Sequence, residues 1–425
     1  MSEENLIPEA RPEGLNQQNQ EEEKENIEEE VLDPNRPETK PNFKKMEYRH
    51  LGNSGLRVSI LSYGNWANND NADLTYESVK LCLENGINFF DTAEVYGLGK
   101  GEINLGKAIK KLNIPREKIV ISTKIYRNGD DPNDSFLSRK HIMEGLKNSL
   151  KRLQLDYVDI LYCHRYDMRT PLEETCKAMN DLIEDEKILY WGTSQWTSCQ
   201  IMEAIKICNE RNYIKPIVEQ CQYNMLRREK MENEYNDLLR KYKIGISSFS
   251  PLYSGVLSGK YIKEIPPDSR YLRNKDATPV LKVYFDKKQD WDVKLNKLLD
   301  ICKKLDCTLA QLSIAWVIIN PDVSTSIMGA TKINQLEENI NAMKIYKKLD
   351  KNILLEIEKI LQNTPQGEII YRSFTMMRSR RNINLGVDYP DFKKDEGKKK
   401  KKKLKKKKKK EEKKEKKLVK NILLY

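Results

Sequence analysis

The chain has little of what marks metal-binding, disulfide-rich or membrane-spanning proteins. It has only three histidines, and its eight cysteines include no Cys-x-x-Cys pair, so neither a zinc site nor a redox motif is indicated. We expect reduced cysteines and no bound metal. The longest apolar run, 312–319, is far shorter than the ~20 residues of a membrane-spanning helix. Because no signal peptide or lipid-attachment motif is recognisable either, we expect a cytoplasmic protein.

Charge is concentrated at the two ends of the chain. Residues 1–40 carry 13 acidic and four basic residues, and residues 393–420 carry 19 lysines and five acidic residues. The formal net charge of +12 therefore reflects the tail, and the middle of the chain is only mildly basic. Such end segments bury too little apolar surface to offset their ordering entropy. We predict a disordered acidic extension at 1–45, a barrel at 46–375 and a lysine-rich disordered tail at 376–425.

The lysine run 398–410 has two interpretations. It is either a solvated tail or an electrostatic tether to an acidic surface, such as membrane lipid, tubulin or nucleic acid. If the acidic surface is membrane lipid, the cytoplasmic protein would lie peripherally at the membrane.

Short apolar runs alternate with longer amphipathic stretches from about residue 55. Eight strands are predicted, at 58–63, 88–92, 119–124, 158–164, 189–194, 217–223, 245–250 and 324–329. Helices are predicted at 74–84, 136–153, 173–186, 201–212, 229–241 and 291–305. Strands that are apolar throughout indicate burial on both faces, as in a parallel sheet. Eight such units favour an α/β fold of the (β/α)8 TIM barrel type over an open doubly wound sheet, whose Gly-x-Gly-x-x-Gly fingerprint does not follow the first strand.

Four residues with complementary chemistry lie at or after the ends of three predicted strands. In a barrel of this type the carboxyl ends of the strands form the active-site rim, so Asp91, Tyr96, Lys124 and His164 would meet there. Tyrosine, with a pKa near ~10, can protonate a carbonyl oxygen if a neighbouring ammonium lowers that pKa. A carboxylate would hold the ammonium, and an imidazole would orient the carbonyl. The set predicts a carbonyl reductase with Tyr96 as general acid.

Several longer motifs extend this pattern. They are Tyr48-Arg49-His50-Leu51-Gly52-Asn53-Ser54-Gly55-Leu56, Phe90-Asp91-Thr92-Ala93-Glu94-Val95-Tyr96-Gly97, Ser122-Thr123-Lys124, Leu155-Asp156-Tyr157-Val158-Asp159, Tyr190-Trp191-Gly192-Thr193-Ser194, Glu219-Gln220-Cys221-Gln222-Tyr223-Asn224, Ser250-Pro251-Leu252, Gly329-Ala330-Thr331 and Tyr371-Arg372-Ser373. On these motifs the chain resembles the aldo-keto reductase superfamily. More closely, it resembles the branch that contains the β-subunits of voltage-gated potassium channels and their plant relatives.

The resemblance implies an NADPH-dependent reductase of aldehydes or ketones with slow turnover. The family's catalytic tetrad falls on Asp91, Tyr96, Lys124 and His164. Many animal channel β-subunits carry Asn at the fourth position, so His164 favours turnover. The resemblance also implies an alternative function: a channel auxiliary subunit that assembles as a homotetramer, binds a channel α-subunit and uses bound NADP(H) as a redox sensor.

The family's contacts to NADPH or NADP+ map onto strand ends and two loops. They fall on Asn65, Trp66, Asp91, Ser194, Gln195, Gln220, Phe249, Ser250, Pro251, Leu252, Ser254, Lys260, Arg270, Gly329, Thr331, Gln335, Glu338 and Asn339. Ser194 and Gln220 would hydrogen-bond the carboxamide, and Tyr223 or Trp191 would stack on the nicotinamide. Lys260 and Arg270 are candidates for the cofactor's phosphates, and an arginine on the 2′-phosphate would select NADPH over NADH.

One of these loops has a direct physical rationale. Gly329-Ala330-Thr331 leaves the last predicted strand and opens a helix, whose free N–H groups favour a phosphate. Three departures weaken parts of the match. Gln195 stands where channel β-subunits carry Arg, Tyr253 replaces a small residue, and Trp66 is followed by Ala-Asn-Asn-Asp where the family has a glycine-rich stretch.

Overall fold

The computed structural model describes residues 37–267, 269, 272, 279–365, 369–370, 375–376 and 381. Residues 1–36 and 382–425 lie outside the described residues, as do Arg270 and Tyr371-Arg372-Ser373. The predicted extensions and their boundaries therefore stay predictions.

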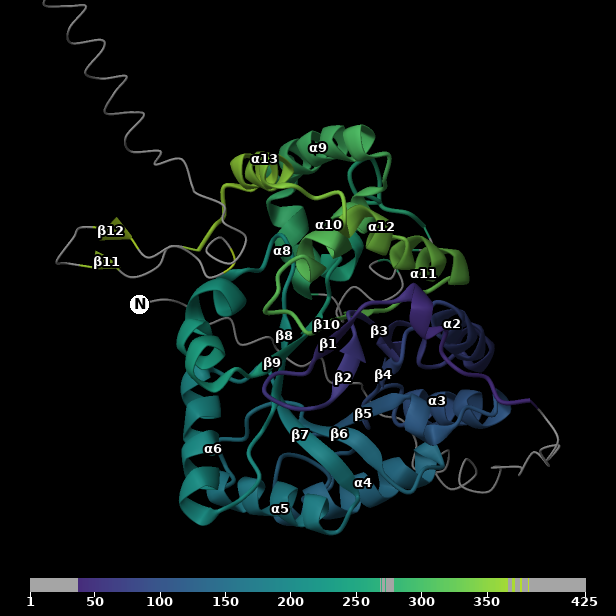
Figure 1. The fold of residues 1–425 in the computed structure, drawn as a ribbon, viewed down its shortest axis with the longest axis vertical. Helices are drawn as coiled ribbons and strands as arrows, with labels where there is room; N and C mark the ends of the chain where they lie inside the picture. Colours follow the sequence, from purple (N-terminus) through teal and green to yellow (C-terminus); the bar gives the residue numbers. More distant parts are fainter. Residues whose placement is uncertain are drawn as a thin grey trace, which may run out of the picture.

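Eight parallel strands close into a barrel, which confirms the (β/α)8 prediction (Figure 1). They are β3 (Leu61–Gly64), β4 (Phe89–Asp91), β5 (Val120–Ile125), β6 (Val158–Cys163), β7 (Ile188–Ser194), β8 (Val218–Gln222), β9 (Gly245–Phe249) and β10 (Thr325–Met328). The ring closes because β10 pairs with both β9 and β3, with Ser326 opposite Ser248 on one side and opposite Leu61 on the other. An open sheet would leave these strands as edges, so that alternative is wrong.

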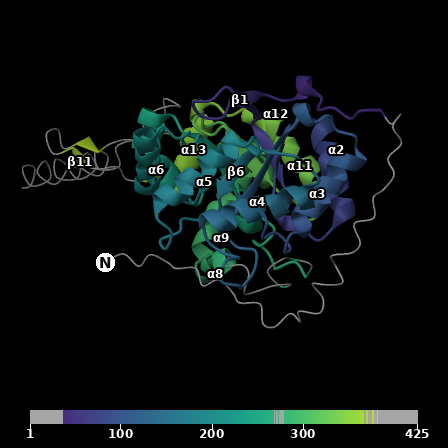
Figure 2. The same ribbon diagram turned by 90° about the horizontal axis from the view of Figure 1, so that it is seen from below.

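Helices surround the strands in the alternating order that the sequence predicts (Figure 2). The outer layer includes α2 (Ala72–Glu84), α3 (Lys100–Lys111), α4 (Arg139–Leu153), α5 (Leu172–Glu184), α6 (Ser198–Arg211), α8 (Pro279–Asp286), α9 (Lys288–Leu305), α10 (Leu309–Ile318), α11 (Ile333–Ile340), α12 (Ala342–Tyr346) and α13 (Lys351–Leu361). Side-chain caps fix several starts: Thr197 and Gln200 form a reciprocal capping box at α6, and Thr308 and Gln311 form another at α10. The longest apolar run of the sequence lies in α10, which is buried, not membrane-spanning.

Shorter elements connect these units. They are the 3-10 turns η1 (Phe43–Lys45), η2 (Asn65–Asn68), η3 (Arg116–Lys118) and η6 (Tyr253–Ser258), the π-helical segments η4 (Lys230–Glu234) and η5 (Leu238–Tyr242), and the paired strands β11 (Ile369–Ile370) and β12 (Thr375–Met376). The helix predicted at 229–241 thus contains two π-helical segments, which residues 235–237 separate.

The strand predicted at 58–63 is two strands. Its first half, β2 (Arg57–Ser59), pairs antiparallel with β1 (Tyr48–His50), and only the second half enters the barrel as β3. The amide of Asn88 exchanges hydrogen bonds with Ser59, which holds β2 beside the start of β4. Between β1 and β2, Gly52 has a φ of +62°, and a Cβ there would lie 2.3 Å from the Gly245 nitrogen. Leu51 and Val58 cluster with the first residues of β4, β5 and β8, so this hairpin covers the end of the barrel opposite the carboxyl ends of the strands.

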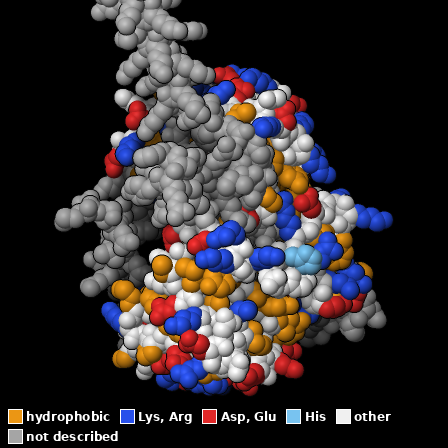
Figure 3. Space-filling model, turned by 60° about the vertical axis from the view of Figure 1, so that its left-hand side comes forward, with side chains coloured by type: hydrophobic (Ala, Val, Ile, Leu, Met, Phe, Trp, Pro, Cys, Tyr) orange, Lys and Arg blue, Asp and Glu red, His pale blue; other side chains and the backbone are white. Residues whose placement is uncertain are grey.

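The surface of the barrel carries mixed charge. On the face in Figure 3, Lys and Arg side chains alternate with Asp and Glu, and hydrophobic side chains gather between them. In the part of the chain that the structure describes, no helix is long and apolar enough to cross a membrane. No cluster of three or more His, Cys, Asp or Glu side chains suited to a metal ion occurs among those residues either.

Candidate active site

Lys124 is the central residue of the four that were predicted at the ends of the strands. Its ammonium donates to Asp91 Oδ2 at 2.6 Å, to the Thr92 carbonyl at 2.7 Å and to the Tyr96 hydroxyl oxygen at 3.1 Å. The side chain is completely buried, and so is nearly all of Asp91. All three N–H donors of the ammonium are thus used, and one of them is directed at Tyr96.

The second carboxylate oxygen of Asp91 also accepts hydrogen bonds. Oδ1 accepts from Ser122 Oγ at 2.6 Å and from Gln220 Nε2 at 3.1 Å. Burial alone would lower the pKa of Lys124, but the Asp91 carboxylate and Tyr96 outweigh it and raise that pKa above its usual value. Lys124 therefore stays charged at neutral pH.

The pKa of Tyr96 departs from the sequence-based expectation. Burial raises it above the usual value near 10, and the opposing effect of Lys124 does not overcome burial. The ammonium makes the phenol more acidic than burial alone would leave it, but does not ionise it. The hydroxyl is consequently protonated at neutral pH, which is the state a proton donor requires.

His164 faces Tyr96 from the residue after β6. The two ring centroids lie 6.0 Å apart in an edge-to-face arrangement. Burial holds the pKa of His164 well below 6.5, and the charges of Arg165 and Lys124 lower it further. The imidazole is therefore neutral at pH 7 and keeps one N–H donor and one acceptor nitrogen.

These residues open on a cavity of about 1030 Å³ at the carboxyl ends of the strands. Asp91, Tyr96 and His164 line it, and Lys124 lies behind Tyr96. Most of the predicted cofactor residues also line the cavity: Trp66, Asp91, Ser194, Gln220, Phe249, Ser250, Pro251, Leu252, Ser254, Lys260, Gly329, Thr331, Gln335, Glu338 and Asn339. Its size matches pockets that hold a large organic ligand.

The sequence is similar to those of known proteins. The model of the aldo/keto reductase family matches residues 61–362, which span the barrel and the residues around the cavity. The chain belongs to the aldo/keto reductase family. It is also 45% identical over 331 residues to the "Probable voltage-gated potassium channel subunit beta" of Oryza sativa subsp. japonica and 46% identical over 331 residues to a protein of the same name from Arabidopsis thaliana. Each match covers 77% of this chain and 100% of the relative, which confirms the predicted branch.

Some predicted residues of this aldo/keto reductase lie off the cavity wall. The Asn65 side chain is buried and donates to the Gly101 carbonyl at 2.6 Å, and Gln195 Oε1 accepts from the Gln222 backbone at 3.4 Å. Neither residue lines the cavity.

Neither of the two aromatic residues predicted to stack on the nicotinamide lines the cavity. Trp191 donates from its indole to the Ile214 carbonyl at 2.7 Å, and Tyr223 packs on Trp316 with centroids 5.3 Å apart. Both side chains are fully buried in the protein interior. Because both faces of a strand in such a barrel are buried, the sequence alone did not show which face each residue takes.

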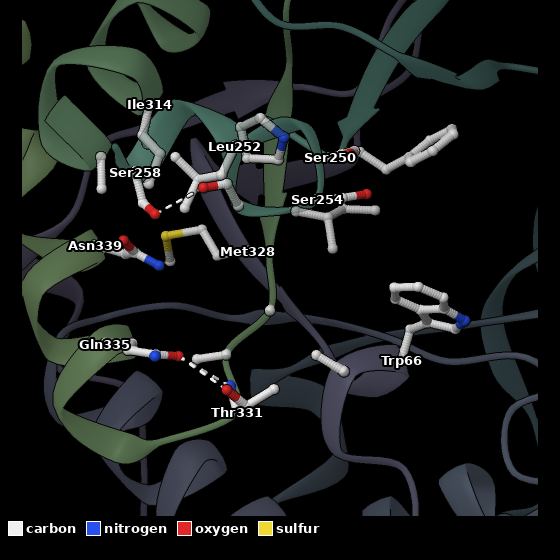
Figure 4. A pocket seen from close by; sticks show the side chains of 18 of the residues that line it. Trp66, Ser250, Leu252, Ser254, Ser258, Ile314, Met328, Thr331, Gln335 and Asn339 are labelled. Carbon is white, nitrogen blue, oxygen red and sulfur yellow. Dashed lines mark hydrogen bonds between the residues drawn. The ribbon is translucent and has the colours of Figure 1, made fainter. Parts of the chain in front are cut away.

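The loop after β9 forms one wall of the cavity (Figure 4). Ser250, Tyr253 and Ser254 have φ angles of 56°, 47° and 55°, and Gly255 has 90°. Left-handed backbone at three non-glycine residues is energetically costly, so packing of the surrounding residues must hold this loop in its shape. Tyr253, the departure noted in the sequence, is buried, with the Arg227 guanidinium 5.9 Å from its ring centroid.

The opposite wall comes from the turn between β10 and α11. Figure 4 shows Thr331, Gln335 and Asn339 on this side, facing Ser250 and Ser258. Gln335 Oε1 accepts from both the Thr331 N–H and its hydroxyl at 3.2 Å, which holds the turn. Trp66 stands at another side of the cavity and is 48% exposed.

Several lining residues were not predicted, among them Arg165 and Lys332. Arg165 directly follows His164 and donates to its carbonyl at 2.6 Å, and Lys332 directly precedes α11. Their positions next to predicted residues at a strand end and a helix start were the signals available in the sequence.

Proposed function

We propose that this aldo/keto reductase reduces aldehydes or ketones with NADPH and that Tyr96 supplies the proton. The observation that carries the proposal is the contact between Lys124 and Tyr96. Because Lys124 donates to the phenol oxygen at 3.1 Å, the hydroxyl proton of Tyr96 is left for an acceptor in the cavity.

The cavity fits a nicotinamide dinucleotide by its chemistry. Ser194 and Gln220 offer a hydroxyl and an amide beside Asp91, suited to a carboxamide. Lys260 and Lys332 line the same cavity, and Lys332 directly precedes α11, whose N-terminus favours a phosphate. Cationic contacts to a 2′-phosphate would select NADPH over NADH; Arg270, the second predicted cation, lies outside the described residues. When bound, this cofactor supplies the hydride.

The protein's own residues handle the proton. Tyr96 donates its proton to the carbonyl oxygen of the substrate, and the phenolate that forms is stabilised by the Lys124 ammonium. Asp91 and the Thr92 carbonyl keep that ammonium in place. The neutral His164 donates an N–H to the same carbonyl oxygen and orients it. Slow turnover is part of the proposal.

The test compares wild type with Tyr96→Phe for NADPH oxidation across a panel of aromatic aldehydes. Phenylalanine keeps the ring and removes the proton, so we expect kcat to fall about 10²–10⁴-fold while NADPH affinity is retained. Tyr242→Phe is the matched control, because it removes the same hydroxyl at an exposed position away from the cavity and should keep wild-type kcat. Equal rates in wild type and Tyr96→Phe would overturn the proposal.

A second candidate function rests on the names of the relatives, which are potassium channel β-subunits. In that case the chain assembles as a homotetramer, binds a channel α-subunit and reports the NADPH/NADP+ ratio to it. The protein would then be cytoplasmic and peripheral at the membrane. Sizing the full chain by light scattering, with and without a coexpressed channel, tests this function. A monomer that retains no channel would exclude it.

A further inference from the structure

Two cysteines meet at the C-terminal end of α9. The Cys307 N–H donates to the Cys302 carbonyl at 3.0 Å, and Asp306 between them has a φ of 53°. This is the Schellman arrangement, in which the side chains of the fourth-last residue of the helix and of the second residue beyond it frequently come into contact. Both of those positions are cysteine here, so the Schellman turn brings the two thiols together.

The two thiols differ in access and in charge state. Cys302 is only 3% exposed, whereas Cys307 is partly exposed. Lys348 donates to the Leu305 carbonyl at 3.0 Å, which brings its ammonium to this helix end. The hydrogen bond from Cys302 lowers the pKa of the Cys307 thiol, and Lys348 lowers it further. Cys307 is thus the accessible nucleophile, and Cys302 is placed behind it to react second.

A second pair of cysteines provides a natural comparison. Cys176 of α5 and Cys208 of α6 also hydrogen-bond through their thiols, but both are fully buried. An oxidant dissolved in water can reach Cys307 and cannot reach this pair without a local opening of the helices. Cys199, at the start of α6, is exposed and serves as a lone thiol for calibration.

We propose that Cys302 and Cys307 form a modification site that hydrogen peroxide converts to a disulfide. The Cys307 sulfur attacks one peroxide oxygen, the O–O bond breaks, and water leaves, so that the sulfur becomes a sulfenic acid and the peroxide is reduced. The Cys302 sulfur then attacks the Cys307 sulfur, the S–O bond breaks, and a second water leaves. The two thiol protons end in the two waters, and the two electrons pass from the sulfurs to the peroxide.

The pair is linked to the cavity wall. Thr308, the next residue after Cys307, caps α10 together with Gln311. Gln311 also donates from Nε2 to the Glu338 carbonyl at 3.0 Å, and Glu338 lines the cavity. The modification site therefore lies two hydrogen-bonded steps from the residues assigned to the cofactor, although its chemistry does not depend on the proposed reductase activity.

The experiment treats the full-length, reduced protein with increasing hydrogen peroxide, alkylates the free thiols and maps disulfides by mass spectrometry. We expect the 302–307 disulfide at doses that leave Cys176 and Cys208 fully alkylated. In Cys302→Ser the sulfenic acid should persist on Cys307 and be trapped by a cyclic 1,3-dione. Lys348→Gln should slow the oxidation several-fold relative to Lys344→Gln, a control on the exposed surface of α12.

Two results would overturn the proposal. One is the absence of a 302–307 disulfide at peroxide doses that oxidise Cys199. The other is formation of the 176–208 disulfide as fast as the 302–307 disulfide, which would mean that contact alone, without access, decides the reaction.

Discussion

Two buried ionic clusters in this barrel look alike and differ in one respect. At the rim, Lys124 is paired with Asp91 and reaches Tyr96. Elsewhere, Arg228 makes four hydrogen bonds of 2.7–2.9 Å to the carboxylates of Glu232 and Glu358, with its side chain 1% exposed. In the second cluster the cation is paired with the two carboxylates. In the first, the cation also donates to the Tyr96 hydroxyl, which faces the cavity. Burial of charge alone therefore does not single out a candidate catalytic site; the Tyr96 hydroxyl that faces the cavity distinguishes the cluster at the rim.

The largest effect is expected at the rim. Lys124→Met removes the cation that stabilises the Tyr96 phenolate and leaves the Asp91 carboxylate buried with Ser122 and Gln220 alone. We expect kcat for aldehyde reduction to fall about 10²–10⁴-fold and the free energy of unfolding to fall by about 3–5 kcal/mol. Steady-state kinetics and urea unfolding of the same preparation measure both. Wild-type kcat in a folded Lys124→Met protein would contradict the role assigned to this cluster.

Arg228→Met should lower stability without lowering kcat, and so distinguish the two clusters. It leaves two buried carboxylates without their cation, so we expect a loss of stability of about 3–5 kcal/mol. The kcat of the folded fraction should stay at the wild-type value, because Arg228 does not line the cavity. Arg240→Met, which removes one exposed ion pair, is the control and should change stability by less than about 1 kcal/mol. If kcat fell in Arg228→Met as far as in Lys124→Met, the two clusters would not differ in their effect on catalysis.

A smaller effect is expected at Glu219, a buried carboxylate that accepts from Thr193 Oγ1 at 2.6 Å and Tyr235 Oη at 3.2 Å. Burial raises its pKa to about 7 from 4.5. The folded state therefore holds this proton to higher pH than the unfolded state, and stability falls as pH rises from 4.5 to 7 and then levels off. Glu219→Gln should be more stable than wild type by on the order of 3 kcal/mol at pH 8.

The pH dependence of that difference is the control. It should shrink toward zero at pH 4, where wild-type Glu219 is protonated in both states. Urea midpoints of the two proteins from pH 4 to 8 measure it. A difference that is independent of pH would show that the substitution acts through packing and not through the proton.

The barrel and most of the cavity could be predicted because they depend on local patterns. Eight apolar runs fixed the strands, and the rule that chemistry lies at the carboxyl ends selected Asp91 and Lys124 at strand ends and Tyr96 and His164 just beyond. The division of 58–63 into β2 and β3 was not predictable, because it depends on hydrogen bonds between Ser59 and Asn88, 29 residues apart.

Features that depend on packing in three dimensions were missed. A strand that is apolar on both faces does not tell which way Trp191 points, and the nearby cation alone gave the wrong sign for the pKa of Tyr96, since burial outweighs it. The Arg228 cluster joins residues 130 positions apart and has no signature in the sequence.

In the proposed reaction, NADPH supplies the hydride and Tyr96 supplies the proton to the same substrate carbonyl. Reduction of an aromatic aldehyde with NADPH deuterated at both positions of nicotinamide C4, followed by mass spectrometry of the alcohol, tests it most directly. The account predicts one deuterium on the carbinol carbon in the wild-type product and at least about a 100-fold slower appearance of that product with Tyr96→Phe. An alcohol without deuterium, or labelled product formed equally fast by both proteins, would contradict it.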